Sequence, residues 1–557
     1  MMGEKAREVT GRREFIAFLA AGAACSAFAA WGKPSALPRA RVGLLTDTHI
    51  TDDPDSCKLV GEAFRLFRRE KIDTILHAGD LAGVWSPAGY REYRRLFHEV
   101  FAGCEPREIF SYGQHDGVNF SEELKSGQKW YDVKWPAFAA AMESGQSYKT
   151  VTTLGGFPLV VYPENYWEND EEDQLLRLVD ETVKAHPNSP VFVLRHRPAA
   201  GTTRNSERFG CWCGDKARMA KYPNVIMLTG HTHGNLYDEA TIWQEGFTSV
   251  DLGTLEWPRL HCVGMPIKIH QQHCVMSMDV FDDRAEFTRW NLRTGREIGE
   301  KWVVPWGLRP ELLGTEARRT RERTGHFDPT ARAVAESDGK GGWLVRFPEV
   351  LDSASVHRYE VRAEVGGRTV AVVGVRGPWY SENCESSPPE ARFRSGLFAV
   401  GDEMRFKVVP ITFLGKCGPT LETDRVVQPA ESGIGEVWQG KPEVEKVATH
   451  PCGYMFHLPK EACKGKKGTH FRVSLSLVAD GGGSLSVYSD LRRRIVGWSV
   501  TALYAEGGTD REPLEYALDF VSERDDDRFS IYFYETMATF ARLAQVKVVK
   551  VLNLSQK

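Results

Sequence analysis

The sequence predicts a multidomain protein in which one α/β sandwich is followed by two all-β sandwich domains. The chain has 557 residues, more than a single hydrophobic core normally serves, so we expect two to four domains. From Arg41 onward, short apolar strands alternate with amphipathic helices, which is typical of an α/β domain. Beyond Trp343 the apolar residues recur with a period of two, which indicates strands with one buried face.

Five elements open the predicted α/β domain. Strands are expected at Val42–Leu45, Ile72–Leu76 and Glu108–Tyr112, and helices at Ser56–Glu70 and Tyr90–Phe101. In such a domain, ligands bind at the carboxyl ends of the strands. Residues that follow these strands are therefore the first candidates for a functional site.

Later elements are expected to complete this domain. A helix at Leu175–Ala185 leads into the strand before His196, and strands are expected at Cys274–Val280 and Ala285–Leu292. The domain should close near Pro310. Between His115 and His196 lies an aromatic insertion that either lines a substrate cleft or caps the sheet, and both interpretations stay open. Its aromatic residues are Trp130, Tyr131, Trp135, Tyr166 and Trp167.

Composition limits the classes of partner. The net charge is -4 and the isoelectric point is about 6.5, so no basic field favours nucleic acid and we expect none as a partner. With 42% hydrophobic and 26% charged residues, the composition is that of an ordinary globular protein. Beyond the N-terminal segment, no stretch is long and apolar enough to predict a transmembrane span.

Residues 1–29 are predicted to be a signal peptide of the twin-arginine type. Arg12 and Arg13 precede an alanine-rich apolar run that ends in Ala-x-Ala at Ala27–Ala29. The alternative is a general secretory signal that happens to contain two arginines. Both interpretations predict export to the periplasm or the extracellular space. Because twin-arginine export moves folded proteins, a metal centre could be loaded before export.

Five polar motifs each follow an apolar strand, and they contain the residue types that bind metals. Spacing alone is weak evidence for a metal site, but five motifs of one form make chance an unsatisfactory explanation. In chain order they are D-x-H (Asp47, His49), G-D (Asp80), G-x-H-D (Gln114, His115, Asp116), a single His196, and G-H-x-H (His231, His233).

This ordered set resembles the calcineurin-like metallophosphoesterase family over roughly residues 41–310. The resemblance implies a dinuclear metal centre whose imidazole and carboxylate ligands suit Mn, Fe, Zn or Co. It implies that His115 protonates the leaving group and that Asp116 orients His115. By the same resemblance, Asp47, His49 and His233 would hold one metal, Gln114, His196 and His231 the other, and Asp80 would bridge them.

Two positions depart from the patterns of this family. Gln114 stands where the family has Asn, and its extra methylene puts the affinity of the second metal site in question. Gly83 stands where the purple acid phosphatases have Tyr, which argues against a ferric purple enzyme. The residues expected to bind phosphate are Arg204 and Arg208, because strand alternation would turn Arg195 and Arg197 away from His196.

The remaining chain is expected to form a linker and two β-sandwiches. Residues 311–328 are predicted to be a linker or a short surface helix. Residues 329–427 loosely resemble a fibronectin type III domain, and residues 436–557 resemble a jelly-roll module of the kind found in carbohydrate-active proteins. Trp498 would either stack on a cell-surface polysaccharide or pack in the core. Candidate disulfides join Cys384 to Cys417 and Cys452 to Cys463.

The sequence therefore predicts an exported phosphoesterase with two divalent metal ions, in which metal-activated hydroxide attacks a phosphate ester and His115 is the general acid. Whether the substrate is a monoester or a diester stays open. The alternative is a non-catalytic metal- or polymer-binding protein whose phosphoesterase site has decayed.

Overall fold

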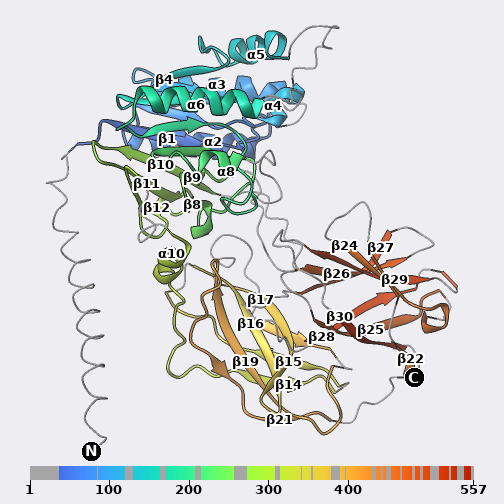
Figure 1. The fold of residues 1–557 in the computed structure, drawn as a ribbon. Helices are drawn as coiled ribbons and strands as arrows, with labels where there is room; N and C mark the ends of the chain where they lie inside the picture. The colour runs from blue at the N-terminus through green and yellow to red at the C-terminus, as the bar shows by residue number, and fades with distance from the viewer. Residues whose placement is uncertain are drawn as a thin grey trace, which may run out of the picture.

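The structure is a computed structural model that describes residues 37–553 with gaps (Figure 1). The predicted signal peptide, residues 1–29, lies outside the described part, as do Tyr166, Trp167, Arg208, Cys384 and Cys452. The gaps are residues 84–85, 120–129, 164–170, 207–214, 256–272, 308–313, 340, 353–354, 378–388, 395–396, 430–434, 441–442, 447–452, 464–466, 479–482, 490–493, 502–513, 523, 526–527 and 536–544.

Two mixed β-sheets form the centre of the α/β domain. In the first sheet the strand order is β12-β11-β10-β1-β2-β3, with β13 also paired to β11, and β1, β2 and β3 are parallel. The second has the order β4-β5-β6-β7-β9-β8. The strands of the first sheet are β1 (Ala40–Leu45), β2 (Thr74–His77), β3 (Arg107–Phe110), β10 (Cys274–Val280), β11 (Arg284–Asn291), β12 (Arg296–Glu297) and β13 (Trp302–Pro305). Those of the second are β4 (Thr150–Leu154), β5 (Phe157–Val161), β6 (Val191–Leu194), β7 (Val225–Thr229), β8 (Ile242–Gln244) and β9 (Thr248–Asp251).

The two sheets face each other, and helices cover their outer faces. Leu44 of β1 and Leu76 of β2 share one buried core with Phe192 of β6 and Leu228 of β7. A second core joins the first sheet to three helices, and a third joins the second sheet to two. The outer helices are α2 (Pro54–Arg69), α3 (Pro87–Phe101) and α5 (Trp130–Ala141) on the first sheet, and α6 (Glu171–Ala185) and α8 (Asp215–Met219) on the second. The short elements α4 (Gln114–Asn119) and η1 (Glu239–Thr241) lie in connecting loops.

The sequence predicted the leading elements of this domain to within a few residues. Apolar side chains at helical spacing, such as Leu59 and Phe67 of α2, are buried, and Asp53 caps that helix by accepting from the backbone N–H groups of Asp55 and Ser56. Strand β10 has the predicted bounds. Because the parallel strands of both sheets end at the same side, the predicted ligands meet there.

The chain after this domain forms further β-sheets, as the period of two indicated. One pair of sheets has the orders β14-β15-β18 and β17-β16-β19-β20, with β21 on β19, and shares a core that includes Val345, Val361 and Phe406. The strands are β14 (Val334–Ser337), β15 (Trp343–Arg346), β16 (Val356–Val365), β17 (Arg368–Arg376), β18 (Glu390–Phe393), β19 (Glu403–Thr412), β20 (Leu421–Glu422) and β21 (Val426–Val427).

A second pair of sheets follows, with the orders β22-β30-β25-β28 and β23-β24-β29-β26-β27. Phe456, Val473 and Ile531 belong to its core. The elements are β22 (Gly435–Gly440), β23 (Glu443–Lys446), β24 (Gly453–His457), η2 (Lys460–Cys463), β25 (His470–Val478), β26 (Gly483–Ser489), β27 (Arg494–Thr501), β28 (Leu514–Val521), β29 (Phe529–Glu535) and β30 (Gln545–Asn553). Trp498 lies in β27, but its side chain is outside the described part. The fibronectin type III and jelly-roll resemblances stay predictions.

The structure bears on two predictions for this half of the chain. Cys417 is a free, exposed thiol, which contradicts the predicted disulfide with Cys384, a residue outside the described part. The charged stretch contains the predicted short helix, α10 (Thr315–Arg321), most of which is exposed or half-buried, but Arg318 and Glu322 are buried. Their burial follows from docking: Arg318 donates to the backbone carbonyl of Glu239, and Glu322 accepts from the backbone N–H of Leu414 at 3.1 Å. Among the described residues, no helix is long and apolar enough to cross a membrane.

Candidate metal centre

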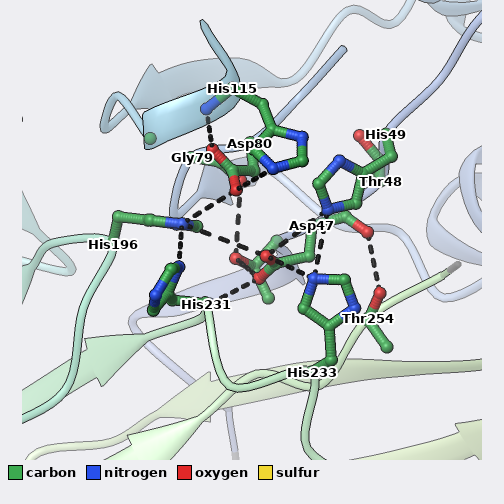
Figure 2. Close-up of polar contacts among 12 residues, drawn as sticks. Asp47, Thr48, His49, Gly79, Asp80, His115, His196, His231, His233 and Thr254 are labelled. Atoms are coloured by element: carbon green, nitrogen blue, oxygen red, sulfur yellow. Dashed lines mark hydrogen bonds and ion pairs between the residues drawn. The ribbon is translucent and has the colours of Figure 1, made fainter. Parts of the chain in front are cut away.

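Sharp left-handed turns carry the predicted ligands at the ends of the strands. Asp47, His49, Asp80, His231 and His233 all have positive φ, between 42° and 65°. Non-glycine residues rarely adopt this conformation, which costs about 1 to 3 kcal/mol each and persists only where surrounding contacts hold it. The turns bring these five side chains together in one buried group (Figure 2).

Asp47, His49 and His233 form the first cluster of potential ligands. Nε2 of His49 lies 3.2 Å from Nε2 of His233, and Oδ1 of Asp47 lies 3.2 Å from the same His233 atom. All three side chains are almost completely buried. Oδ2 of Asp47 is held by the backbone N–H of His231 at 2.7 Å and by the hydroxyl of Thr46. These two bonds leave Oδ1 pointing at the imidazoles.

Asp80, His196 and His231 form the second cluster. Nδ1 of His196 lies 2.9 Å from the backbone carbonyl of Ala78 and must donate to it, which leaves a lone pair on Nε2 in the neutral ring. That Nε2 lies 3.1 Å from Oδ2 of Asp80 and 3.2 Å from Nδ1 of His231. Acceptor atoms therefore converge on one point (Figure 2).

This donor set fits divalent metal ions. Oδ1 of Asp47 is buried and accepts no hydrogen bond from the described residues, which is costly unless a cation compensates. Burial raises the pKa of the Asp80 carboxyl, but His196 and His49 outweigh this effect and hold it well below its usual range. Burial and His196 also lower the pKa of His231. Anionic carboxylates beside neutral imidazoles are the ligands that Mn, Fe, Zn and Co accept.

His115 lies at the rim of the same group and forms a third set of potential metal ligands with Asp80 and His49. Its Nε2 lies 4.0 Å from Oδ2 of Asp80, and its ring meets the His49 ring edge-on at 4.5 Å. Its side chain is 31% exposed, whereas that of Asp80 is 2% exposed. The backbone N–H of His115 donates to Oδ1 of Asp80 at 2.7 Å. His115 is thus placed between the buried ligands and solvent.

Asp116 does not orient His115 as expected. Its carboxylate accepts from the backbone N–H groups of Leu81 and Gly113, both at 3.1 Å, and from the hydroxyl of Tyr90 at 2.8 Å. Nδ1 of His115 is buried with no hydrogen-bond partner among the described residues. Asp116 therefore ties the loop of Asp80 to the loop of His115. Burial raises its pKa to about 6.

Gln114 is more exposed than the other predicted ligands, and the predicted roles of the described arginines are not supported by their contacts. Gln114 starts α4 and is exposed, unlike the other predicted ligands, so its role as a ligand stays a prediction. Arg204 forms an ion pair with Asp238 and donates to the backbone carbonyl of Phe413 at 2.8 Å, so its guanidinium group already has partners within the protein. Strand β6 ends at Leu194, so the alternation of side chains along a strand does not determine the direction of Arg197. The positive charge of Arg197 contributes to the low pKa of His231.

One aromatic residue of the insertion supports the capping interpretation. Trp135 is 5% exposed, and its ring packs against Phe138 and Tyr148 at 5.5 and 5.6 Å. The structure does not describe the side chains of Trp130 and Tyr131.

Sequence reasoning missed the residues that hold the ligand turns. The hydroxyl of Thr254 donates to the backbone carbonyl of Asp47 at 2.8 Å (Figure 2), and that of Thr232 donates to Asp251 behind His231 and His233. Burial raises the pKa of Asp251 to about 8. In the sequence, the one indication of such a role was that Thr232 lies inside the G-H-x-H motif.

Residues 40–235 match the family described as calcineurin-like phosphoesterase. This stretch is therefore a calcineurin-like metallophosphoesterase domain, of a family that uses dinuclear metal centres. A comparison with curated proteins found no match.

Solved structures that match part of this chain include a dimetal phosphatase from Danio rerio, with 14% identity over 48% of this chain and 100% of that chain and a TM-score of 0.34. A purple acid phosphatase from yellow lupin has 13% identity over 48% of this chain and 53% of its own, with a TM-score of 0.33. The phosphoesterase Yfce from E. coli has 10% identity over 47% and 99%, with a TM-score of 0.24.

Proposed function

We propose that this protein is an exported phosphoesterase that uses two divalent metal ions to hydrolyse phosphate mono- or diesters. The observation that carries the proposal is the convergence of buried acceptor atoms from four strand ends on one place, with no hydrogen bond from the described residues to Oδ1 of Asp47. The match of residues 40–235 to a phosphoesterase family supports it.

The two clusters suggest how the metals would be held. Asp47, His49 and His233 would bind one ion, and His196 and His231 the other. Asp80 would bridge the two, because its carboxylate lies within ligand distance of His196 and His231 on one side and of His49 on the other. Gln114 would complete the second site, with its longer side chain making that ion the more exchangeable one.

The two ions, when bound, would neutralise the phosphate oxygens and activate a water molecule as the nucleophile. His115 would hold a proton at Nε2, at the solvent-facing rim, and transfer it to the leaving alkoxide. The buried imidazoles and carboxylates beneath would exclude water from all but the open side. The choice between monoester and diester depends on groups around this rim.

The decisive experiment combines metal analysis with an activity screen of the full chain. We expect two metal equivalents after loading with Mn or Zn, and hydrolysis of p-nitrophenyl phosphate or bis-p-nitrophenyl phosphate. Asp80→Ala should lose both metals and the activity, because two cations would lack their common anion. Asp55→Asn, an exposed carboxylate in the first turn of α2, is the matched control and should behave as the wild type. An Asp80→Ala protein with full metal content and activity would refute the proposal.

A further inference from the structure

A buried histidine that belongs to neither cluster connects the loops of both. His77 is the last residue of β2 and has no exposed surface. Its two ring nitrogens have different partners: the backbone N–H of Gly79 lies 3.2 Å from Nδ1, and the hydroxyl of Thr48 lies 3.2 Å from Nε2. Thr48 stands between the ligands Asp47 and His49, and Gly79 directly precedes Asp80.

These partners determine where the ring proton lies. The backbone N–H of Gly79 can only donate, so Nδ1 of His77 must be an acceptor, and a neutral ring then carries its proton on Nε2. Nε2 consequently donates to the hydroxyl oxygen of Thr48. The hydroxyl proton of Thr48 is in turn donated to the backbone carbonyl of Leu81, at 2.6 Å. Burial lowers the pKa of His77 to about 3, which agrees with a neutral ring.

The loops joined by this bridge are held in an unfavourable conformation. Asp47 and His49 on one side, and Gly79 and Asp80 on the other, all have positive φ. Gly79 has a φ of 101°, and a Cβ there would lie 2.7 Å from the backbone nitrogen of Gly113. Backbone bonds from Asp47 to Gly79, from His49 to Asp80 and from Ile50 to Leu81, at 3.0, 3.2 and 2.9 Å, link the loops, as does the bond from the Thr48 hydroxyl to Leu81. The His77 bridge adds a connection through a buried side chain.

We propose that His77 is a positioning residue for the metal centre: as the Nε2-protonated neutral tautomer, it fixes the spacing of the Asp47–His49 loop relative to the Asp80 loop and so sets metal affinity. It touches neither metal nor substrate. The inference rests on the proposed function, since it requires metals at these loops. The alternative is that His77 only fills space, as its edge-on contact with Tyr93 at 6.1 Å would allow.

Three substitutions at one position separate bonding from packing. His77→Leu fills the space and removes both hydrogen bonds. His77→Asn keeps an acceptor close to the position of Nδ1, and His77→Gln keeps a donor close to that of Nε2. Thr48→Val removes the other end of the bridge without changing His77. The metal dissociation constants of all four variants are measured by titration with Mn and by competition with a chelator, and the melting temperature of each metal-free protein reports folding.

We expect His77→Leu to weaken metal binding by about tenfold or more, while the Asn and Gln variants each recover part of the loss. Thr48→Val should weaken binding, because it removes both the bond to His77 and the bond to the backbone carbonyl of Leu81. Combined with His77→Leu, its effect should be smaller than the sum of the two single effects, because both variants remove the His77–Thr48 bond. Long-range ¹⁵N correlation spectra of the wild type should show His77 protonated on Nε2. An Nδ1-protonated ring, or wild-type metal affinity in both His77→Leu and Thr48→Val, would overturn the inference. If either result is found while the wild type binds metal tightly, only the role of His77 is refuted and the proposed function stands. If the wild type binds no metal, both the role of His77 and the proposed function are refuted.

Discussion

Replacement of Glu322 by glutamine should make the docking of the first β-sheet pair on the phosphoesterase domain less sensitive to pH. Glu322 follows α10 and is buried, and its carboxyl accepts from the backbone N–H of Leu414 and from the hydroxyl of Thr412. Burial raises its pKa from an ordinary value of 4.5 to about 8, and the nearby carboxylates of Asp238 and Glu239 add to the shift.

The sign of the effect follows from linkage. Because the folded protein holds this proton more tightly than the unfolded chain does, the stabilisation is complete below pH 4.5 and is lost as the pH rises through about 8. One pKa unit corresponds to about 1.4 kcal/mol, so the wild type should lose roughly 2 to 3 kcal/mol of unfolding free energy between pH 5 and 7. Glutamine resembles the protonated carboxyl and does not titrate, so Glu322→Gln should avoid this loss.

Urea denaturation of the full chain at pH 5, 6, 7 and 8, followed by tryptophan fluorescence, measures the difference between the variant and the wild type. We expect little difference at pH 5 and a variant that is more stable by roughly 2 to 3 kcal/mol at pH 7. Glu316→Gln, an exposed glutamate in the first turn of α10, should show no such pH-dependent gain. A difference between Glu322→Gln and the wild type that is the same at pH 5 and pH 7 would refute the reasoning.

Three further predictions concern the site and export. His115→Ala should retain metal and lose rate by roughly 10² to 10⁴-fold, with a smaller loss on p-nitrophenyl esters, whose leaving group hardly needs a proton; a metal-free variant would show that His115 is a ligand. Gln114→Asn should raise second-metal occupancy and activity at low metal concentration, as measured by metal analysis and rate. If the wild type is inactive at saturating metal while Gln114→Asn is active, the protein is better described as a binding protein with a decayed site. Conversion of Arg12 and Arg13 to lysine should block export, which fractionation and intact mass would detect; unimpaired export leaves the general secretory signal.

Local sequence patterns were sufficient for the elements and for most of the site. Apolar runs and helical spacing predicted β1, α2, α3 and β10, since burial of one face is encoded by neighbouring residues. Because parallel strands end at one edge, the motifs that follow them could be expected to meet, and Asp47, His49, Asp80, His196, His231 and His233 do so.

Contacts between distant segments decided what the sequence could not. The partners of Asp116, Arg204 and Glu322 lie far away along the chain, at Leu81, Asp238 and Leu414, so no local pattern reveals whether each of these charges is buried, paired or free for a ligand. The bridge through His77 is of the same kind: the sequence shows a histidine in an apolar strand, and only the folded chain brings Thr48 to its ring. The spacing of apolar residues determined which residues lie at the strand ends, because that spacing is set by residues close together in the sequence. The protonation, pairing and exposure of each side chain depend instead on packing against residues that are distant in the sequence.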